Sequence, residues 1–516
     1  MATRRSTSER TGQKNRKTGK GSIRPKKNGF GNFCLVLQAL ASLAFMGVVI
    51  LLDMLPLKYL GLVAMILFFL WCITFLSQAA RKKRGIAGKL YSLLVIAVLA
   101  VGTYYVAKTN NMISMITSGG VKVDKMVVAV LADDPAETLE DAADYSYGVQ
   151  FAQGAENMQS VVLDIQNQLG TDINMTEYES VQEQAQALTD GEVQAIVYNQ
   201  SYTDLMDEAV EGYSSQIKVI YSHEIETKLD LGGSEEDDIL TKEPFAVYIG
   251  GMDVYGDDRD TGYRDTEHGD VNIIAVVNPT THQILLVTTP RDYFVPIPGV
   301  SGGMNDKLTH AATYGIDASM ATLEELYETD INYYVKMNFS ALIEIVDILG
   351  GVDVYSESAF TTSENSEYVM DVQEGYNHFT GEQALAFSRE RENLPGGDNH
   401  RGRNQQAVIT AMLKKALSPI MLLKADRIIN QVSNDIETNV TQGQLNSLVK
   451  YQLESGAKWT IQSVAATGYD GEDYPYSMPD SLVYVMYPDE GSINEIIHLV
   501  NVVEEGRYLT EGEELN

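Results

Sequence analysis

The sequence predicts an α/β protein that begins with three transmembrane helices. Three observations lead to this prediction. Long apolar stretches lie within the first 108 residues, and strand-like and helix-like patterns alternate in the rest of the chain. The first of these two parts is basic and the second is acidic. Its 516 residues suffice for a membrane region and two further domains. We expect a small α/β accessory domain at 121–228, a linker at 229–243 and a larger α/β domain at 244–516.

The charge distribution separates the two parts of the chain. Residues 1–108 contain 17 Lys and Arg against 2 Asp and Glu, whereas residues 109–516 contain 21 against 69. Such an acidic bulk argues against nucleic acid as a partner, because nucleic-acid binding needs a basic surface. Both cysteines, Cys34 and Cys72, lie in apolar stretches, so the sequence offers neither a disulfide framework nor a thiolate metal site.

The N-terminal region consists of a basic tail and three apolar stretches. The tail, residues 1–29, is too polar to bury a core and is expected to be disordered. The stretches that are long enough to cross a bilayer are Phe33–Leu55, Leu57–Ala79 and Leu90–Ala107. Several such stretches exclude a cleaved signal peptide.

The distribution of basic residues around these stretches predicts their orientation. The tail and the loop Arg81–Arg84 are both basic, which marks the cytoplasmic side. Three spans then place the C-terminal domains outside a bacterial plasma membrane, after a short connector at 109–120.

Alternating strands and helices are predicted for the accessory domain. Its strands are expected at Met126–Ala132, Val193–Tyr198 and Ile217–Tyr221, and its helices at Ala155–Leu169 and Tyr202–Val210. No catalytic combination of side chains stands out in this segment. We therefore expect a scaffold or a protein-interaction domain.

The same alternation continues through the larger domain. Strands are expected at Phe245–Ile249, Val271–Val277, Gln283–Thr289, Ile331–Met337, Gly351–Tyr355 and Trp459–Ala465. Helices are expected at Asp306–Tyr314, Met320–Tyr327, Phe339–Leu349, Ala425–Asp435, Gln442–Leu453 and Ile493–Val503. Thr380 and Gln383 have the spacing of a capping box and open another helix, which runs to about Glu390. A further helix is expected to begin near Arg401.

Four arginines fall within fifteen residues of this acidic domain: Arg389, Arg391, Arg401 and Arg403. The planar guanidinium group matches phosphate and carboxylate oxygens two at a time. One interpretation is therefore a phosphate or pyrophosphate clamp. The other is a set of ion pairs with the neighbouring acids Glu390, Glu392 and Asp398, and the residues themselves leave both open.

Charged residues also stand at the ends of predicted strands. Asp253 follows one strand, Asp270 precedes the next, and Arg291 emerges where the returning strand stops. The two carboxylates suit magnesium, which takes a few hard oxygens and shares its coordination with substrate phosphates. Aspartates and arginines together suit phosphoryl transfer. For Asp253 ordinary Gly-Asp turn chemistry is an alternative.

These motifs resemble the LytR-CpsA-Psr family. The resemblance covers about residues 244–420 and rests on the runs IGGMD, HGDVN, VVNPTTHQILLVTTPRDYFVPIPG, DKLTHAATYG, INYYVKMNFSALIEIVDILGGVDVY, LAFSRERE and RGRNQQ, in this order. The three spans and the preceding small domain are similar to those of the capsule-associated, CpsA-type members. The resemblance implies an α/β/α domain with a central mixed sheet.

The resemblance also implies an activity and its partners. Such enzymes move a glycopolymer, a capsular polysaccharide or a wall-teichoic-acid-like polymer, from a polyprenyl-pyrophosphate carrier to peptidoglycan. Membrane lipid and polysaccharide export or assembly proteins are the other partners expected. The alternatives are hydrolysis of the same lipid-linked glycan, or a non-enzymatic lipid-binding sensor that regulates polysaccharide assembly.

The roles of single residues follow from the same resemblance. Catalytic roles are implied for Asp253, Asp270, Arg291, Arg389 and Arg391, and contacts to the pyrophosphate lipid for Arg291, Arg389, Arg391, Arg401 and Gln405. Asp253 and Asp270 would hold Mg²⁺. The apolar helices Phe339–Leu349 and Ala407–Leu417 would line a tunnel for the lipid, although an ordinary packed core explains them equally well.

One motif departs from the family pattern. This chain has His268-Gly269-Asp270 where the family often has Arg-Ser-Asp, so one positive charge beside the metal is missing. Arg264, four residues before His268, is a candidate to replace that charge.

Overall fold

The computed structural model describes ten segments of the chain: residues 29–79, 86–116, 121–152, 154–228, 236–252, 269–366, 368–394, 397–418, 436–479 and 481–509. The chain divides into two compact units. One comprises Met1–Met46 and Leu62–Gly102, and the other comprises Gly47–Gly61 and Thr103–Asn516.

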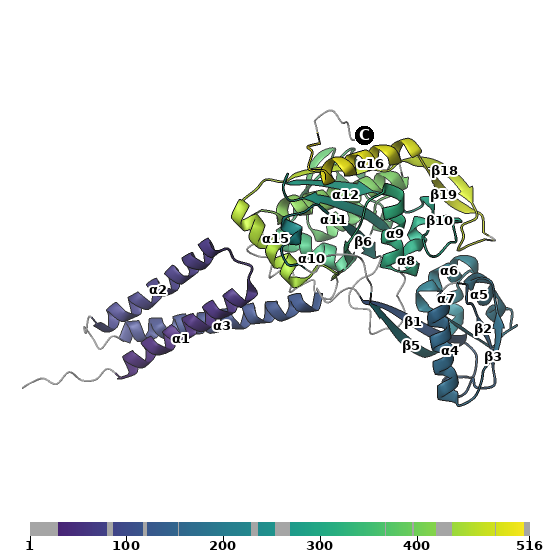
Figure 1. Cartoon of the computed structure of the whole chain (residues 1–516), viewed down its shortest axis with the longest axis horizontal. Coiled ribbons are helices and arrows are strands. Elements are labelled where there is room, and N and C mark those ends of the chain that lie inside the picture. The colour runs from purple at the N-terminus through teal and green to yellow at the C-terminus, as the bar shows by residue number, and fades with distance from the viewer. Residues whose placement is uncertain are drawn as a thin grey trace, which may run out of the picture. The chain divides into compact units, whose positions relative to one another are not determined.

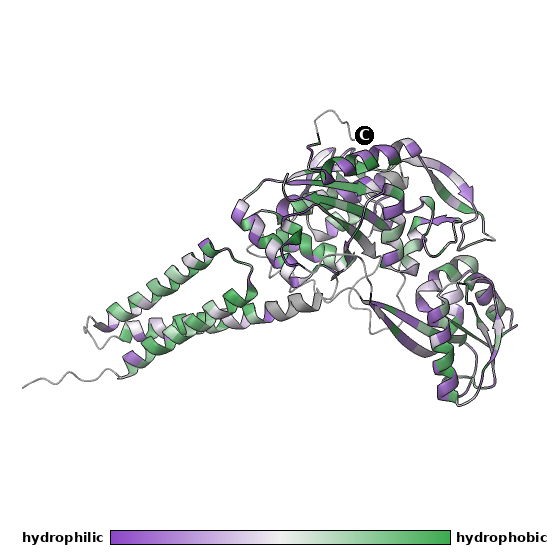
Figure 2. Ribbon diagram, in the orientation of Figure 1, coloured by the Kyte–Doolittle hydropathy of each residue, from purple (hydrophilic) through white to green (hydrophobic). Residues whose placement is uncertain are grey.

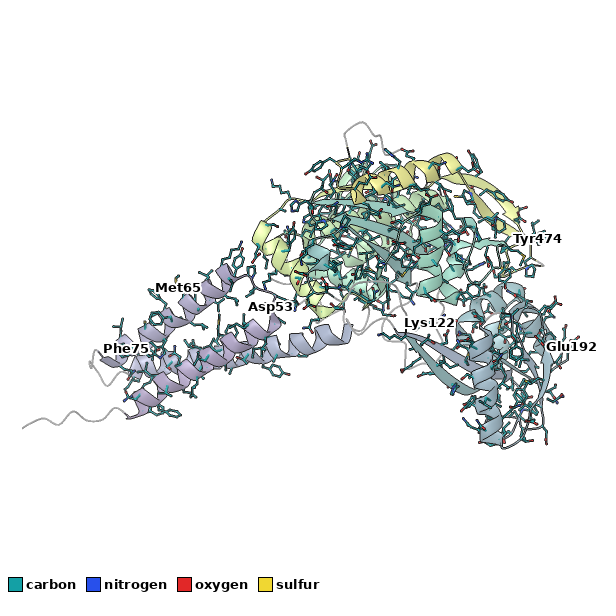
Figure 3. The ribbon with its side chains drawn as sticks, viewed as in Figure 1. Asp53, Met65, Phe75, Lys122, Glu192 and Tyr474 are labelled. Atoms are coloured by element: carbon teal, nitrogen blue, oxygen red, sulfur yellow. The ribbon has the colours of Figure 1, made fainter. Side chains whose placement is uncertain are left out.

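Three long apolar helices form the N-terminal region, as predicted: α1 (Gly29–Leu52), α2 (Leu57–Ala79) and α3 (Ile86–Ile116). Each is long and apolar enough to cross a membrane. Apolar residues dominate all three in Figure 2, and Figure 3 shows Met65 and Phe75 projecting from α2. So much exposed apolar surface suits contact with lipid. Helix α3 runs through most of the connector expected at 109–120, because residues 109–116 contain neither Pro nor Gly.

Residues 121–228 contain a five-stranded sheet with the order β3-β2-β4-β1-β5. Its strands are β1 (Val121–Leu131), β2 (Ser146–Val149), β3 (Asn174–Glu177), β4 (Ala195–Asn199) and β5 (Ile217–Lys228). The helices of this segment are α4 (Ala155–Leu169), α5 (Val181–Thr189), α6 (Thr203–Ala209) and α7 (Tyr213–Gln216). Strand β3 was not predicted, because all four of its residues are exposed and it lacks an apolar pattern.

The larger domain is built on a six-stranded mixed sheet with the order β16-β11-β6-β7-β8-β17. Its strands are β6 (Phe245–Met252), β7 (Val271–Asn278), β8 (Gln283–Thr288), β11 (Tyr333–Asn338), β16 (Ile436–Thr438) and β17 (Thr460–Ala465). Strands β6, β8, β11 and β17 run in one direction, and β7 runs against them between β6 and β8.

Helices cover both faces of this sheet, which gives the expected α/β/α arrangement (Figure 1). One face packs on α8 (Leu308–Tyr314), α9 (Ile316–Tyr327) and α16 (Glu490–Glu504). The other packs on α10 (Phe339–Leu349), α11 (Gly381–Arg389) and α12 (Gly397–Ala416). Successive residues of β7 alternate between the two clusters: Ile273 belongs to the second and Ile274 to the first. Burial on both sides explains why the central strands are almost uniformly apolar.

Short two-stranded ribbons complete the domain. They pair β9 (Phe294–Pro296) with β10 (Asn305–Lys307), β12 (Val352–Ser356) with β15 (Gly375–Phe379), β13 (Phe360–Thr361) with β14 (Asp371–Val372), and β18 (Gly468–Asp473) with β19 (Val483–Pro488). Helix α15 (Gln442–Ser455) lies between β16 and β17 in sequence.

Several predicted helix starts were wrong by two to four residues, among them those of α9, which begins at Ile316 and not at Met320, and of α16, which begins at Glu490 and not at Ile493. The helix expected from Asp306 begins at Leu308, because Asp306 pairs with Val295 between β10 and β9. The helix expected near Arg401 begins at Gly397, which places Arg401 in its second turn. The helix expected at Ala425–Asp435 lies outside the described residues.

Candidate active site

A cavity of about 310 Å³ lies at one edge of the mixed sheet. Gly250 and Gly251 end β6, Asp270 precedes β7, Arg291 follows β8, and Asn338 ends β11; all five line the cavity. These residues meet because β7 runs against its neighbours, so its beginning lies beside their ends. Charged residues at strand ends are thus gathered at one edge, as their positions in the sequence indicated.

Arginines form the charged wall of this cavity. Arg389 is the last residue of α11, Arg391 follows two residues later, and Arg401 comes from α12; all three line the cavity together with Arg291. Gln405, one turn after Arg401, joins them. The structure therefore brings all five predicted pyrophosphate contacts around one space, together with Asp270.

Two contacts orient these arginines. The Arg291 Nη1 donates to the Asp270 Oδ1 over 2.6 Å, and both side chains are about a quarter exposed. The Arg389 guanidinium lies over the ring of Phe339, with its Cζ 4.6 Å from the ring centroid. Stacking on the ring fixes the plane of the guanidinium, whose N–H groups lie at its edge.

The fourth clustered arginine, Arg403, faces another partner. Its Nε donates to both carboxylate oxygens of Glu357, at 3.1 and 3.0 Å, and Arg403 does not line the cavity. Position in sequence alone could not separate Arg403 from Arg401. Helical geometry separates them, because side chains two positions apart on a helix point in directions that differ by about 200°.

Glu390, between Arg389 and Arg391, is buried and binds backbone N–H groups. Its carboxylate accepts hydrogen bonds from the backbone of Ser363, from Arg391 at 3.0 Å and from Asn393 at 2.9 Å. Burial alone would raise the pKa of Glu390, but these hydrogen bonds outweigh it and hold the pKa below its ordinary value. Glu390 thus joins the end of α11 to the loop at Ser363, a role that the ion-pair interpretation did not foresee.

Apolar side chains form the remaining wall of the cavity: Ile249, Val271, Met337, Leu342, Leu385, Val408 and Ile409. Leu342 comes from α10 and Val408 and Ile409 from α12, the two helices that were expected to line a lipid tunnel. An arginine wall facing an apolar wall suits a ligand with an anionic group next to a hydrocarbon.

The sequence offered no signal for the rim formed by Ser363 and Asn365. Both line the cavity from the segment after β13, which contains only the one-turn 3₁₀ helix Glu364–Ser366, too short for a periodic pattern. Glu392 fixes this rim, since its carboxylate accepts a hydrogen bond from the Asn365 Nδ2 over 2.6 Å. Asn338 could have been found as a helix cap, because its side chain accepts from the Ala341 N–H at the start of α10.

The residues at the predicted magnesium site can be tested only in part. Asp253, Arg264 and His268 lie outside the described residues. Of the two predicted magnesium ligands, the structure therefore describes only Asp270. Within the described segments no group of three His, Cys, Asp or Glu side chains is suited to a metal. One carboxylate beside a wall of arginines is compatible with magnesium, which is usually held by one or two carboxylates and substrate phosphates.

Comparison with known proteins shows which family this chain is similar to. Residues 206–490 match the profile of the LytR_cpsA_psr family, and this segment contains every residue that lines the cavity. The polyisoprenyl-teichoic acid–peptidoglycan teichoic acid transferase TagU of Bacillus mycoides is 31% identical over 261 residues, 50% of this chain and 79% of that protein. The TagU protein of Enterococcus faecalis is 34% identical over 236 residues, 45% of this chain and 74% of that protein. The solved structure of B. subtilis TagV aligns with 23% identity and a TM-score of 0.42, covering 52% of this chain and 99% of TagV.

Proposed function

The chain belongs to the LytR-CpsA-Psr family, and from this premise we propose that it transfers a glycopolymer from a polyisoprenyl-pyrophosphate carrier to peptidoglycan. The TagU relatives carry the name of a transferase that acts between a polyisoprenyl-linked teichoic acid and peptidoglycan. The polymer moved by this chain is a capsular polysaccharide or a polymer similar to wall teichoic acid.

One observation carries the proposal: four arginines and an apolar wall share a single cavity. A polyisoprenyl pyrophosphate has the matching pair of properties, since its pyrophosphate is strongly anionic and its chain is hydrocarbon. The arginines would bind the phosphate oxygens through paired N–H groups. The side chains of Leu342, Val408 and Ile409 would cover the first isoprene units, and each buried CH₂ contributes about 0.8 kcal/mol.

The reaction is a displacement at the phosphorus that bears the glycan. A peptidoglycan hydroxyl oxygen forms a bond to this phosphorus, and the bond from phosphorus to the bridging oxygen breaks. Polyisoprenyl phosphate leaves with that oxygen, and the hydroxyl proton leaves to water. Arg389, Arg391 and Arg401 stabilise the charge that grows on the leaving phosphate, and Arg291 keeps Asp270 in place.

Magnesium belongs to the same proposal. Asp270, with Asp253 as the second ligand, would hold the ion together with phosphate oxygens of the donor. When bound, the ion would neutralise part of the phosphate charge during displacement.

We also propose an orientation for the chain. The basic tail and the basic loop between α2 and α3 would remain in the cytoplasm of a bacterium. An odd number of spans then places residues after α3 on the outer face of the plasma membrane, where peptidoglycan is found.

A transfer assay with the full chain in lipid nanodiscs tests the proposal. The reactants are a labelled polyisoprenyl-pyrophosphate oligosaccharide, magnesium and uncrosslinked peptidoglycan. Label should appear on peptidoglycan, and Arg389→Ala should reduce its rate by about 100- to 1,000-fold. Arg403→Ala is the matched control, since Arg403 lies in the same cluster but outside the cavity, and it should retain the rate within about threefold. Release of free sugar phosphate without attachment would establish hydrolysis instead, and equal losses in the two variants would refute the arginine assignment.

A further inference from the structure

Exposed tyrosines crowd the hairpin formed by β18 and β19. Their exposed fractions are 64% for Tyr469, 52% for Tyr474, 42% for Tyr484 and 36% for Tyr487. Figure 3 shows Tyr474 at the outer end of this hairpin. Four solvent-facing aromatic rings within twenty residues are unusual for a surface without a partner. This feature has no part in the arginine cavity, because none of these residues lines it.

Hydrogen bonds to neighbouring carboxylates hold two of the rings in place. The Tyr484 hydroxyl donates to the Asp470 Oδ1 over 2.6 Å, and the Tyr487 hydroxyl donates to the Asp473 Oδ2 over 2.8 Å. The ring of Tyr487 packs directly on Gly471, because a Cβ atom added to Gly471 would stand only 2.3 Å from that ring. Tyr469 is the cross-strand neighbour of Tyr487, so the two rings share one face of the ribbon together with Asp473, whereas Tyr484, opposite Glu472, lies on the other face. The rings are therefore fixed before any ligand binds, which lowers the entropy cost of binding.

The chemistry of this surface favours a neutral sugar chain. Carboxylates alternate with the tyrosines, and Asp470, Glu472 and Asp473 would repel an anionic polymer. The centre of a protein–protein interface is depleted in Asp and Glu, so a protein partner fits less well. Sugars present C–H faces that pack on aromatic rings and hydroxyl groups that donate to carboxylates. The backbone N–H of Tyr474 and the Tyr487 hydroxyl hold the pKa of Asp473 below its ordinary value, which keeps this acceptor charged.

The hairpin is attached next to the cavity. Strand β17 is parallel to β8, so the hairpin that follows β17 leaves the sheet at the edge where Arg291 follows β8. The Met486 N–H donates to the carbonyl oxygen of Asp292 over 2.8 Å, one residue after Arg291. The ring of Phe294 contacts that of Tyr487, with centroids 5.8 Å apart. A chain bound to the hairpin would therefore lie close to the edge at which the arginines gather.

We propose that the β18–β19 hairpin is a glycan-binding platform that holds the neutral amino-sugar chain of the acceptor beside the cavity. This inference rests on the proposed transfer to peptidoglycan and names the surface that receives the acceptor. The hairpin selects the neutral acceptor strand, and its carboxylates keep the anionic donor polymer away from the same surface.

Binding of chitohexaose, a neutral oligomer of N-acetylglucosamine, tests the platform. Calorimetric titration of the full chain in nanodiscs should detect this binding, and Tyr469→Ala and Tyr487→Ala should each weaken it by about two- to tenfold. Tyr469→Phe keeps the ring and should bind like the unaltered chain. Tyr508→Ala is the matched control, because Tyr508 is equally exposed, at 66%, but lies outside the hairpin, and it should leave the affinity unaltered.

The same variants separate this inference from the proposed function. In the transfer assay the Tyr469→Ala/Tyr487→Ala double variant should raise the KM for peptidoglycan and leave the affinity for the lipid-linked donor as it was. Unaltered chitohexaose affinity and unaltered KM in the double variant would overturn the platform, even with transfer intact. Loss of chitohexaose binding in that variant would support the platform even if the unaltered chain transferred nothing, a result that would count against the proposed function alone.

Discussion

A single methyl group at Gly381 tests whether helix packing positions the arginines. Gly381 is the first residue of α11, and a Cβ there would stand 2.3 Å from the Ile343 carbonyl oxygen and 2.7 Å from its Cα. These are backbone atoms of α10, which cannot rotate away as a side chain can. Restoring an ordinary contact of 3.4 Å from 2.3 Å requires α11 to move by about 1.1 Å. Arg389 ends the same short helix, so the shift reaches the cavity.

The expected loss has two components. Gly381→Ala should lower the free energy of unfolding by about 1–3 kcal/mol, the usual cost of overpacking. It should also reduce the transfer rate by about 100-fold, since a displacement of about 1 Å at a reacting centre has that effect. Thermal unfolding of the full chain and the transfer assay measure the two quantities separately.

Gly402→Ala is the matched control. Gly402 lies inside α12 between two of the clustered arginines, yet its added Cβ would meet only the Thr288 Cγ2, at 3.5 Å. Alanine there should stabilise the helix by up to about 1 kcal/mol and leave the transfer rate unaltered. If Gly381→Ala behaved like Gly402→Ala in both measurements, the close approach of α10 and α11 would not be what positions Arg389.

Three further predictions concern the site. Glu390→Gln should lower the free energy of unfolding near neutral pH by about 1.5–3 kcal/mol, because a charged acceptor of backbone N–H groups is lost. The pKa of Glu390 is lower in the folded chain than its ordinary value of 4.5, so Glu390 contributes to the free energy of unfolding above that value. This contribution fades as the pH falls towards the folded-state pKa. The difference in melting temperature between Glu390→Gln and the unaltered chain should therefore disappear in acid. Chelation of magnesium and the substitution Asp270→Asn should each reduce the transfer rate by about 100-fold. Added magnesium should restore the activity of the chelated protein but not that of the variant. Full activity in excess chelator would show that magnesium has no part in the mechanism. Leu342→Trp should fill the space beside the apolar wall and weaken the binding of a long-chain donor by roughly tenfold. The binding of a soluble analogue without the isoprenoid chain should not change. Equal effects on both ligands would show that Leu342 does not contact the lipid.

Periodicity predicted the central elements well because burial dictates it. The segments Ala155–Leu169 and Phe339–Leu349 were predicted as helices with the bounds that α4 and α10 have. Both carry a one-sided apolar pattern and end at a glycine in the left-handed region, Gly170 and Gly350. The ribbon strand β15 was missed, since only one of its five residues is buried and its partner lies about twenty residues away in sequence.

The cavity could be predicted in its charges but not in its shape. Strand ends indicated Asp270 and Arg291, and the arginine cluster indicated Arg389, Arg391 and Arg401; the structure places all five around one space. The rim at Ser363 depends on the buried carboxylate of Glu390, a contact between residues 27 apart in sequence. No local pattern encodes such a contact. The roles assigned to these residues stay predictions until the variants are measured.

The charge of the chain explains why the cavity needs two different walls. Residues 109–516 contain 69 Asp and Glu against 21 Lys and Arg, so an anionic polymer that diffuses freely is repelled on approach. At physiological salt this repulsion and the attraction of the arginines both act over only about 8 Å, so charge alone does not draw the donor to the cavity from a distance. Burial of isoprene carbons is not affected by charge and contributes about 0.8 kcal/mol for each CH₂. On the proposed function, the apolar wall would therefore capture the donor by its lipid, and the arginines would then bind the pyrophosphate at short range and set the phosphorus in place for transfer.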